Sequence, residues 1–292
     1  MNRTVNKQIR KLKKALTFSN IALYALTLAV AAFTAIPIVY MVSTAFKPLD
    51  ELLLFPPRYL VRKPTVKNFS DLVMVLGGST VPFTRYLFNS VITVIPAVAL
   101  SVIICSMGAY ALSKCGLPGA NAIFTVVIAA LMFSPHVTQI PTYMVIQRLG
   151  LLNTYWALIF PKIAIAYNFF LMKQFIDQFP DALIEAAKID GAKHNQLFWS
   201  IVMVNLKPAW STLIVFSFVT NWNDYFTPLI YIRKQAMKTL PLAMQSIGAS
   251  GSIGRAGAMA AATLVVTAPT IVIFLIMQRK VMETMIHSGI KA

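Results

Sequence analysis

Long apolar runs separated by short charged segments dominate the pattern of residues along the chain. The first run extends from residue 15 to residue 46 without a charge, and later charge-poor runs cover residues 88–113, 120–146, 154–175, 209–232 and 257–278. About 20 mostly apolar residues are enough for a helix to cross the hydrocarbon core of a bilayer. The pattern therefore predicts an all-α membrane protein with six transmembrane helices.

Every predicted span contains proline, which soluble helices rarely hold in their interior. The prolines are Pro37, Pro96, Pro135, Pro141, Pro161, Pro228 and Pro269. Membrane helices tolerate proline because neighbouring helices satisfy the freed backbone groups, so we expect kinked spans. The first run exceeds the apolar region of a cleaved signal peptide, which is about 7 to 15 residues long. We therefore expect it to stay in the protein as the first span.

Composition and charge agree with a membrane protein. Of the 292 residues, 58% are hydrophobic and 12% are charged, and the formal net charge is +17. An ordinary soluble domain has about 25% charged residues. The basic residues lie between the apolar runs and form no single stripe, so anionic lipid explains them better than nucleic acid does. Cys105 and Cys115 form no CxxC pair, and the sequence predicts neither a disulfide nor a metal site.

The N-terminal tail sets the expected orientation. Basic residues without an acidic residue precede the first span, namely Arg3, Lys7, Arg10, Lys11, Lys13 and Lys14. Cytoplasmic segments carry an excess of Lys and Arg, so we expect this tail inside, and six spans then place the C-terminus inside as well. The expected organisation is a basic tail (1–19), a six-helix domain (20–280) and a cytoplasmic C-terminal tail (281–292), with substantial outside loops at 47–86 and 233–256.

One polar stretch, residues 181–208, interrupts the apolar pattern between the fourth and fifth spans. Asp181 is expected to cap a helix over 182–190, because its carboxylate can accept from free N–H groups of the first turn. Gly191 can adopt a positive φ, which predicts a turn into a second helix over 193–204. The stretch therefore predicts a helical hairpin at the cytoplasmic face. An ordinary amphipathic hairpin at the membrane interface is the alternative.

The sequence EAAKIDGAKHNQLFWSIVMVNLKP within this hairpin resembles the EAA motif of ATP-binding-cassette (ABC) importer permeases. That motif is Glu-Ala-Ala, three residues, Gly, nine residues and Ile-x-Leu-Pro, and the matching residues are Glu185, Ala186, Ala187, Asp190, Gly191 and Ile201. Met203 stands for the Leu and Val204 replaces the Pro. Without this proline, the motif does not predict a hinge at Val204 into the fifth span. The Leu-Lys-Pro sequence ending at Pro208 does fit the family's next turn. The resemblance covers nearly the whole chain, including YLFNSVITV and NWNDYFTPL, and is greatest to the second permease of maltose-type carbohydrate importers.

The resemblance implies a place in a larger transporter of the bacterial cytoplasmic (inner) membrane. The family's six-helix core pairs with a homologous permease subunit, binds two ATP-binding subunits and receives sugar from an extracytoplasmic solute-binding protein. Its EAA hairpin is the coupling helix that sits in a cleft of the ATPase, which implies an ATPase-coupling role for Glu185 to Gly191. The chain has no G-x-x-x-x-G-K-[ST] phosphate loop. We therefore expect ATP and Mg on the partner subunits, no cofactor on this chain, and no enzymatic activity of its own.

Polar residues inside the predicted spans are candidates for a translocation path, because ionisable groups in a bilayer are costly unless they are paired or functional. Lys162, Asp224 and His136 lie at similar depth in the outer halves of their spans. Either Lys162 and Asp224 form an ion pair that joins two helices, or these groups line a cavity whose other polar members are Tyr167, Asn168, Asn221, Trp222 and Asn223. Such side chains offer the hydrogen bonds that a sugar needs, and the rings of Trp222 and Tyr225 could stack on a sugar face.

The sequence thus predicts the permease subunit of an ABC importer for a carbohydrate, with an oligosaccharide as the preferred substrate. An acidic oligosaccharide is a further hypothesis, since a positive vestibule concentrates anions. The second outside loop carries basic residues without an acid, namely Arg233, Lys234, Lys238 and Arg255, and Lys162 is expected to be buried below it. The alternatives are a secondary transporter driven by an ion gradient, with Asp224 and His136 as proton carriers, and an accessory subunit that only anchors a complex. We expect the tail from Lys280 to reach the ATPase, and a frayed terminus is the alternative.

Overall fold

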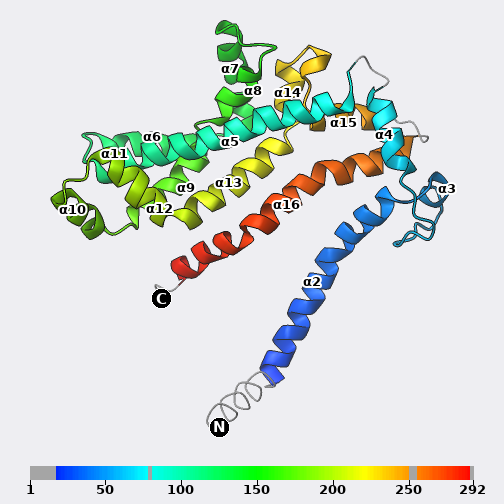
Figure 1. Ribbon diagram of the computed structural model, residues 1–292, viewed down its shortest axis with the longest axis horizontal. Helices are drawn as coiled ribbons and strands as arrows, with labels where there is room; N and C mark the ends of the chain where they lie inside the picture. The colour runs from blue at the N-terminus through cyan, green and yellow to red at the C-terminus, as the bar shows by residue number, and fades with distance from the viewer. Residues whose placement is uncertain (1–17, 78–80, 250–254, 290–292) are drawn as a thin grey trace. The chain divides into compact units, whose positions relative to one another are not determined.

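The computed structural model describes residues 18–77, 81–249 and 255–289, and no strand occurs among them. The helices in chain order are α2 (Phe18–Ala45), α3 (Leu49–Leu52), α4 (Lys67–Gly77), α5 (Phe83–Lys114), α6 (Ala120–Leu131), α7 (Pro135–Arg148), α8 (Tyr155–Ile159), η1 (Phe160–Lys162), α9 (Ala166–Asp177), α10 (Asp181–Ile189), α11 (His194–Gln196), η2 (Leu197–Val202), α12 (Met203–Asn205), α13 (Lys207–Trp222), α14 (Phe226–Tyr231), η3 (Gln235–Met237), α15 (Leu240–Ala249) and α16 (Ala256–Gly289) (Figure 1). The predicted all-α class is confirmed for these residues. The six basic residues of the N-terminal tail lie outside them.

Three helices are each long and apolar enough to cross a membrane, namely Asn20–Ala45, Phe83–Lys114 and Ala256–Met282. Three bent pairs of helices pass the same test together: α6 with α7, the Tyr155–Lys162 segment with α9, and the His194–Asn205 segment with α13. Within the described part of the chain, the number of crossings is therefore three, or up to six if each bent pair counts as one span. The predicted count of six depends on those bent pairs.

The predicted third, fourth and fifth spans are not continuous helices, which corrects the expectation of one helix in each. The predicted fifth span, 209–232, is divided between α13 and α14. The axes of α6 and α7 differ by 110°, and those of the Tyr155–Lys162 segment and α9 differ by 42°. Pro135 is the first residue of α7, a position that suits proline because its missing N–H would have no partner there. By contrast, Pro96 and Pro269 lie inside the continuous helices α5 and α16.

The described chain divides into two compact units, one of residues 18–72 with 255–264 and one of residues 73–77, 81–249 and 265–289. In the first unit, the loop after α2 is closed by buried polar side chains. The Glu51 carboxylate accepts from the backbone N–H groups of Arg62 (3.1 Å) and Lys63 (3.0 Å). The Lys47 ammonium donates to the Arg58 carbonyl. These contacts give the first predicted outside loop a defined structure.

The core of the second unit is built on α5, α9 and α13, which pack side by side along much of their length (Figure 1). Four small side chains on α5 are at most 1% exposed and recur every four residues: Ala97, Ser101, Cys105 and Ala109. This spacing places them on one helix face, and small residues let membrane helices approach closely. Larger side chains of the other two helices, such as Met172 and Leu213, fill the adjoining space.

Candidate functional site

Two polar regions lie at opposite ends of α5 in the second unit, and both contain residues predicted from the sequence. One region surrounds Lys162 and Asp224. The other is the hairpin from α10 to α12, which meets the last residue of α5, Lys114.

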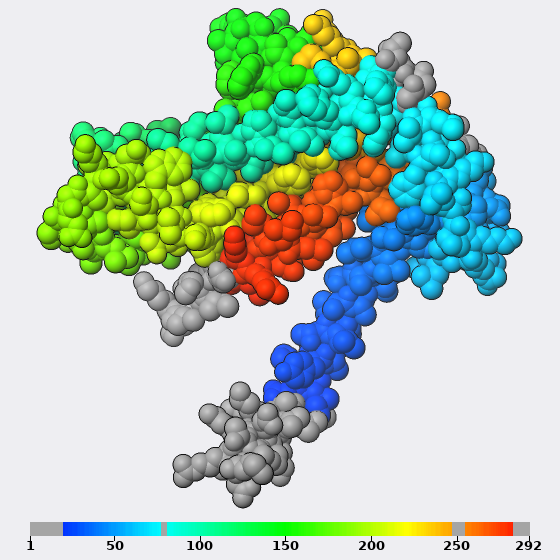
Figure 2. All heavy atoms as spheres, in the orientation of Figure 1, coloured from blue at the N-terminus to red at the C-terminus, as the bar shows by residue number. Residues whose placement is uncertain are grey.

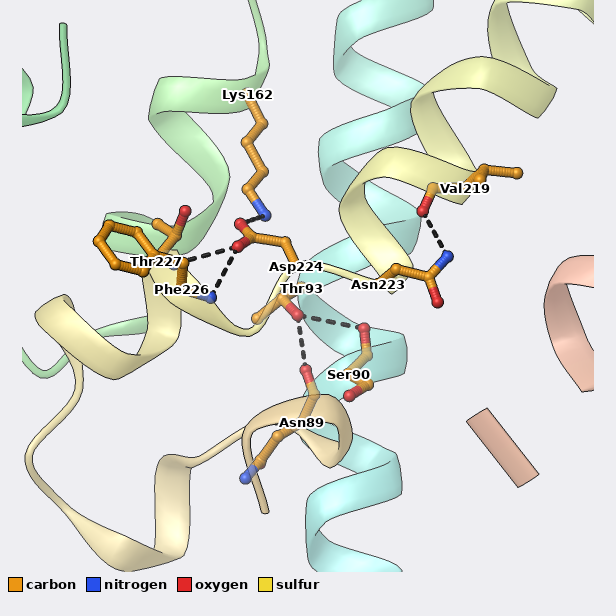
Figure 3. A network of polar contacts seen from close by, with 9 residues as sticks. All are labelled: Asn89, Ser90, Thr93, Lys162, Val219, Asn223, Asp224, Phe226 and Thr227. Carbon is orange, nitrogen blue, oxygen red and sulfur yellow. Dashed lines mark hydrogen bonds and ion pairs between the residues drawn. The ribbon is translucent and has the colours of Figure 1, made fainter. Parts of the chain in front are cut away.

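Lys162 and Asp224 form an ion pair, the contact named in the first of the two alternatives. The Lys162 Nζ atom lies 2.7 Å from Asp224 Oδ2, and the two side chains are only 14% and 18% exposed. Lys162 ends η1, whereas Asp224 occupies the break between α13 and α14. The second carboxylate oxygen of Asp224 accepts from the N–H groups of Phe226 and Thr227, both at 3.0 Å (Figure 3). One carboxylate therefore caps α14 and holds the break against η1.

Four of the predicted path residues line one small cavity, namely Lys162, Asn221, Trp222 and Asp224. The Trp222 ring is only 3% exposed, and its Nε1–H donates to the Val266 carbonyl at 2.9 Å. Phe218 stacks on the ring at 5.5 Å between centroids. In this conformation Trp222 offers no free face on which a sugar could stack.

Asn168 lies apart from that cavity and joins three helices. Its Nδ2 group donates to the hydroxyls of Ser101 on α5 and Ser217 on α13, both at 2.9 Å. The side chain is 3% exposed. Asn168 therefore holds α9 against α5 and α13 within the core, and these two bonds form the Asn168 clamp.

The remaining predicted path residues are exposed and do not line the cavity. Tyr167 on α9 packs edge-on against Phe216, and Asn223 donates to the Val219 carbonyl of its own helix at 2.8 Å (Figure 3). His136 lies in the first turn of α7. The exposed Tyr225 precedes α14. The predicted set is thus distributed over several surfaces of the second unit.

Sequence reasoning missed Asn89, which organises the segment before α15. This fully buried amide donates to the carbonyls of Ala236 (2.9 Å) and Lys238 (2.8 Å) and accepts from the Tyr155 hydroxyl (2.8 Å). The sequence did offer one indication of this role, because Asn89 is a polar amide at the start of the long apolar run 88–113. Asn153, whose φ is +58°, holds the other side of this segment by accepting from the N–H groups of Arg233 and Lys234.

The hairpin matches the predicted elements, with one correction. Helix α10 covers Asp181–Ile189 and Gly191 has a φ of +84°, as expected. Asp181, however, is the first helical residue and makes no capping hydrogen bond. Its carboxylate instead lies 2.7 Å from the Lys114 ammonium, which also donates to the Phe179 carbonyl at 2.8 Å. The Lys114 ammonium of α5 therefore binds the carboxylate that was expected to accept from the free N–H groups of α10.

The second arm of the hairpin is helical but unevenly wound. Residues Leu197–Val202 form a π-helix between the short helices α11 and α12. The arm continues through Val204, and the chain turns by 79° between Asn205 and Lys207. The turn therefore falls at the Leu-Lys-Pro sequence, as the family pattern suggested, and not at Val204. The Trp210 indole N–H closes it by donating to the Met203 carbonyl at 3.1 Å.

The two faces of α10 differ. Ile184 is buried and Ala187 is half-buried against the core of the second unit, whereas Glu185, Ala186 and Asp190 are exposed. Exposed apolar side chains lie with them, including Leu183 at 48% and Ile189 at 86%. Figure 2 shows the hairpin, in yellow-green, as an uncovered surface of its unit.

Both cysteines are free, and neither belongs to a cluster with metal-ligand character among the described residues. Cys115 follows α5, and its Sγ lies 4.0 Å from His194 Nδ1 of the hairpin. Partial burial raises the pKa of the Cys115 thiol, and the nearby Lys188 ammonium opposes that rise only in part. The thiol at this junction therefore stays protonated at neutral pH.

Comparison with known proteins identifies the family. Residues 116–282 match the family described as the binding-protein-dependent transport system inner membrane component. The polygalacturonan/rhamnogalacturonan transport system permease protein YtcP of Bacillus subtilis (strain 168) is 30% identical over 225 residues, which cover 77% of this chain and 76% of the relative. The lactose transport system permease protein LacG of Rhizobium radiobacter is 30% identical over 220 residues, which cover 75% of this chain and 80% of the relative.

A solved structure shares the fold. It is a crystal structure of a bacterial ABC transporter involved in the import of the acidic polysaccharide alginate, with a TM-score of 0.76 and 20% sequence identity. The match covers 89% of this chain and 95% of the matched chain. The predicted resemblance is confirmed: the chain belongs to the family of binding-protein-dependent transport system inner membrane components. The two relatives above are named as permease proteins of sugar transport systems.

Proposed function

We propose that this chain is one of two permease subunits in an ABC importer for an oligosaccharide. It would form the translocation path with a homologous permease, receive substrate from an extracytoplasmic solute-binding protein, and couple to two ATP-binding subunits. The observation that carries this proposal is the hairpin, whose motif residues Glu185 and Ala186 are exposed while the other face of α10 packs on the chain's own core. A secondary transporter driven by an ion gradient has no use for such a hairpin, and membership of a binding-protein-dependent family argues against it.

The exposed face of α10 has the character of a docking surface. Ile189 is 86% exposed, and burial of such a side chain against a partner contributes about 1.5–3 kcal/mol. Glu185 and Asp190 flank the apolar positions and would give the contact its electrostatic specificity. We infer that an ATP-binding subunit covers this face, with Glu185, Ala186, Ala187, Asp190 and Gly191 as the coupling residues.

The core suggests how movement would travel from the hairpin. Lys114 ties the hairpin to the end of α5, and α5 packs along α9 and α13 toward the Lys162–Asp224 region. ATP-driven closure of the partner subunits would move the hairpin with α5 and switch the path between inward and outward access. In this proposal the hairpin and both chain termini are cytoplasmic. The exposed Tyr167, Asn223 and His136 would face the path, while Asn168 and Trp222 brace it.

The coupling role can be tested with Glu185→Lys combined with Gly191→Pro. The first change reverses a charge on the docking face, and the second forbids the positive φ of the turn. We expect normal membrane insertion, weaker association with the ATP-binding subunits and loss of uptake. Asp177→Asn is the matched control, because it removes an acidic charge paired with Lys173 on α9, outside the hairpin. Normal uptake in the double variant would refute the coupling role.

We further propose that the oligosaccharide is acidic. The segment held by Asn89 and Asn153 presents Arg233, Lys234 and Lys238 on a fixed backbone. These three basic residues give the segment a positively charged surface, its positive rim, which would attract anions. Lys162 adds no net positive charge to this surface, because Asp224 neutralises it. One relative is named for an acidic polysaccharide and another for neutral lactose, so the choice rests on the rim.

Uptake of acidic and neutral oligosaccharides of equal length separates the two substrate classes. We expect the triple variant Arg233→Gln, Lys234→Gln and Lys238→Gln to lose uptake of an oligogalacturonide while uptake of a neutral oligosaccharide changes little. The control removes the same number of charges from the first predicted outside loop, through Arg58→Gln, Arg62→Gln and Lys63→Gln. An equal fall for both sugars would contradict the acidic substrate and leave the permease function standing.

A further inference from the structure

A small cavity lies beside the Lys162–Asp224 pair, and its polar lining comes from four parts of the second unit. The polar members are Ser90 and Thr93 from α5, Lys162 from η1, Asn221 and Asp224 at the end of α13, and Thr239 before α15. The space open to the centre of a water molecule is about 10 Å³. A sugar ring is too large to enter a space of this size.

Two of its lining side chains carry buried polar atoms without a protein partner. The Asn221 Nδ2 group and the Thr239 hydroxyl have no hydrogen-bond partner in the part of the chain that the structure describes. Their residues are only 4% and 5% exposed. A buried polar group left without a hydrogen bond costs about 1–3 kcal/mol. Two such groups on one cavity therefore point to a shared ligand that supplies the missing bonds.

We propose that one water molecule binds in this cavity and bridges Asn221 to Thr239. The water oxygen accepts from the Asn221 amide, and the water exchanges a second hydrogen bond with the Thr239 hydroxyl. A cavity must offer roughly 10–15 Å³ by this measure, and two to four polar partners, to hold a water. The Lys162 ammonium lines the same cavity and has three donors, of which Asp224 occupies one. It is therefore a further partner for the water oxygen.

Charge and donor geometry favour water over an ion. Lys162 and Asp224 neutralise each other, so the cavity has no net charge with which to offset the desolvation of an anion. A cation is disfavoured because the amide and ammonium groups present hydrogens to the cavity. Water suits the site because it accepts from these groups and also donates to a hydroxyl oxygen.

The proposed water completes a polar link across three segments. Thr239 precedes Leu240, whose N–H donates to Ser90 Oγ on α5 at 2.8 Å. Asn221 lies three residues before Asp224, which holds the break after α13. The water therefore joins the end of α13 to a segment already fixed on α5, at the point where α13 loses its regular hydrogen bonds.

An experimental structure of the intact transporter, at a resolution that shows ordered waters, tests the assignment directly. We expect a density peak within hydrogen-bonding distance of Asn221 Nδ2 and Thr239 Oγ1. The proposal is overturned if there is no peak, if both side chains turn toward protein partners, or if bromide replaces the peak in a soaked crystal.

A double-mutant cycle gives an independent test, because the two side chains make no direct hydrogen bond. Asn221→Leu and Thr239→Val should each lower the midpoint of thermal unfolding of the purified transporter. If one water joins them, the double variant should lose less than the sum of the two single losses. Thr239→Ser keeps the hydroxyl and should retain the wild-type midpoint. Thr212→Val removes a hydroxyl of α13 that bonds to the Pro208 carbonyl and does not line the cavity, so its loss should be additive with that of Thr239→Val. Additive losses for Asn221→Leu with Thr239→Val would contradict the bridge.

Discussion

The Lys114 ammonium at the end of α5 lies 2.7 Å from the Asp181 carboxylate at the start of α10, and it donates to the Phe179 carbonyl at 2.8 Å. The lysine side chain is 5% exposed, whereas the aspartate side chain is 71% exposed. The buried cation is therefore the central member of this contact. It fixes the hairpin to the longest helix of the core.

The asymmetry of that contact predicts unequal effects of mutation. Lys114→Met keeps the apolar stem but removes both bonds, and should destabilise the hairpin junction by roughly 1–3 kcal/mol. Asp181→Asn leaves the Phe179 bond intact and should cost less than about 1 kcal/mol, as exposed ion pairs do. Thermal unfolding of the purified protein and uptake in cells measure the two effects. Equal losses in the two variants would show that the carboxylate, and not the carbonyl, holds the hairpin.

The Lys162–Asp224 pair predicts a rescue. Removal of one partner from a buried ion pair costs about 3–5 kcal/mol because it leaves an uncompensated charge. The Lys162 and Asp224 side chains are 14% and 18% exposed, so the cost here should fall at or below the lower end of that range. Lys162→Met should therefore reduce thermal stability and the amount of protein in the membrane. Lys162→Met combined with Asp224→Asn removes both charges and keeps a carbonyl oxygen that can cap α14, so it should recover most of the loss. A double variant less stable than Lys162→Met alone would contradict the pairing.

The sequence allowed the prediction of features that depend on composition or on neighbouring residues. The apolar runs located α2, α5 and α16, and Gly191 located the turn of the hairpin. Equal depth in two spans also suggested the ion pair. These features could be predicted because the length of an apolar run and the conformational freedom of a glycine depend only on adjacent residues.

Features that depend on distant partners were not predictable. The capping role expected for Asp181 was wrong because Lys114, 67 residues earlier, competes for the carboxylate. The role of Asn89 depends on carbonyl groups about 150 residues later. The presence of proline did not predict which helices break, because the chain bends before Pro135 whereas α5 continues through Pro96. Neighbouring elements decide between those outcomes, and one sequence does not specify them.

The Asn168 clamp predicts a stability effect without a change of selectivity. Asn168→Leu removes two interhelical hydrogen bonds, each with a hydroxyl acceptor in the core. We expect a loss of about 1–3 kcal/mol, given roughly 0.6–1.7 kcal/mol for such bonds in membrane proteins. The relative uptake rates of different sugars should stay unchanged.

Asn223→Leu is the matched control for this substitution. That exposed amide bonds mainly to the Val219 carbonyl of its own helix, so its replacement should change stability little. Altered sugar selectivity in Asn168→Leu, with unchanged thermal stability, would show that the amide contacts the substrate and does not clamp the helices.

A close approach in the first unit gives the last prediction. A Cβ atom added at Gly257 of α16 would lie 2.2 Å from Asn68 Oδ1 of α4. Asn68 is buried and donates to the carbonyls of Ala45 (2.9 Å) and Lys47 (2.7 Å). Gly257→Ala must therefore displace the amide and weaken both bonds, and we expect a loss of about 1–3 kcal/mol, as in other overpacked sites.

The same contact predicts that the two positions are coupled. Asn68→Ala removes the obstructing oxygen along with both hydrogen bonds, so Gly257→Ala should add little further loss in that background. Met259→Ala changes an exposed side chain nearby and should leave the midpoint of thermal unfolding unchanged. If Gly257→Ala costs as much with Asn68→Ala as without it, the strain comes from a neighbour other than Asn68, and the amide is not the reason for glycine at this position.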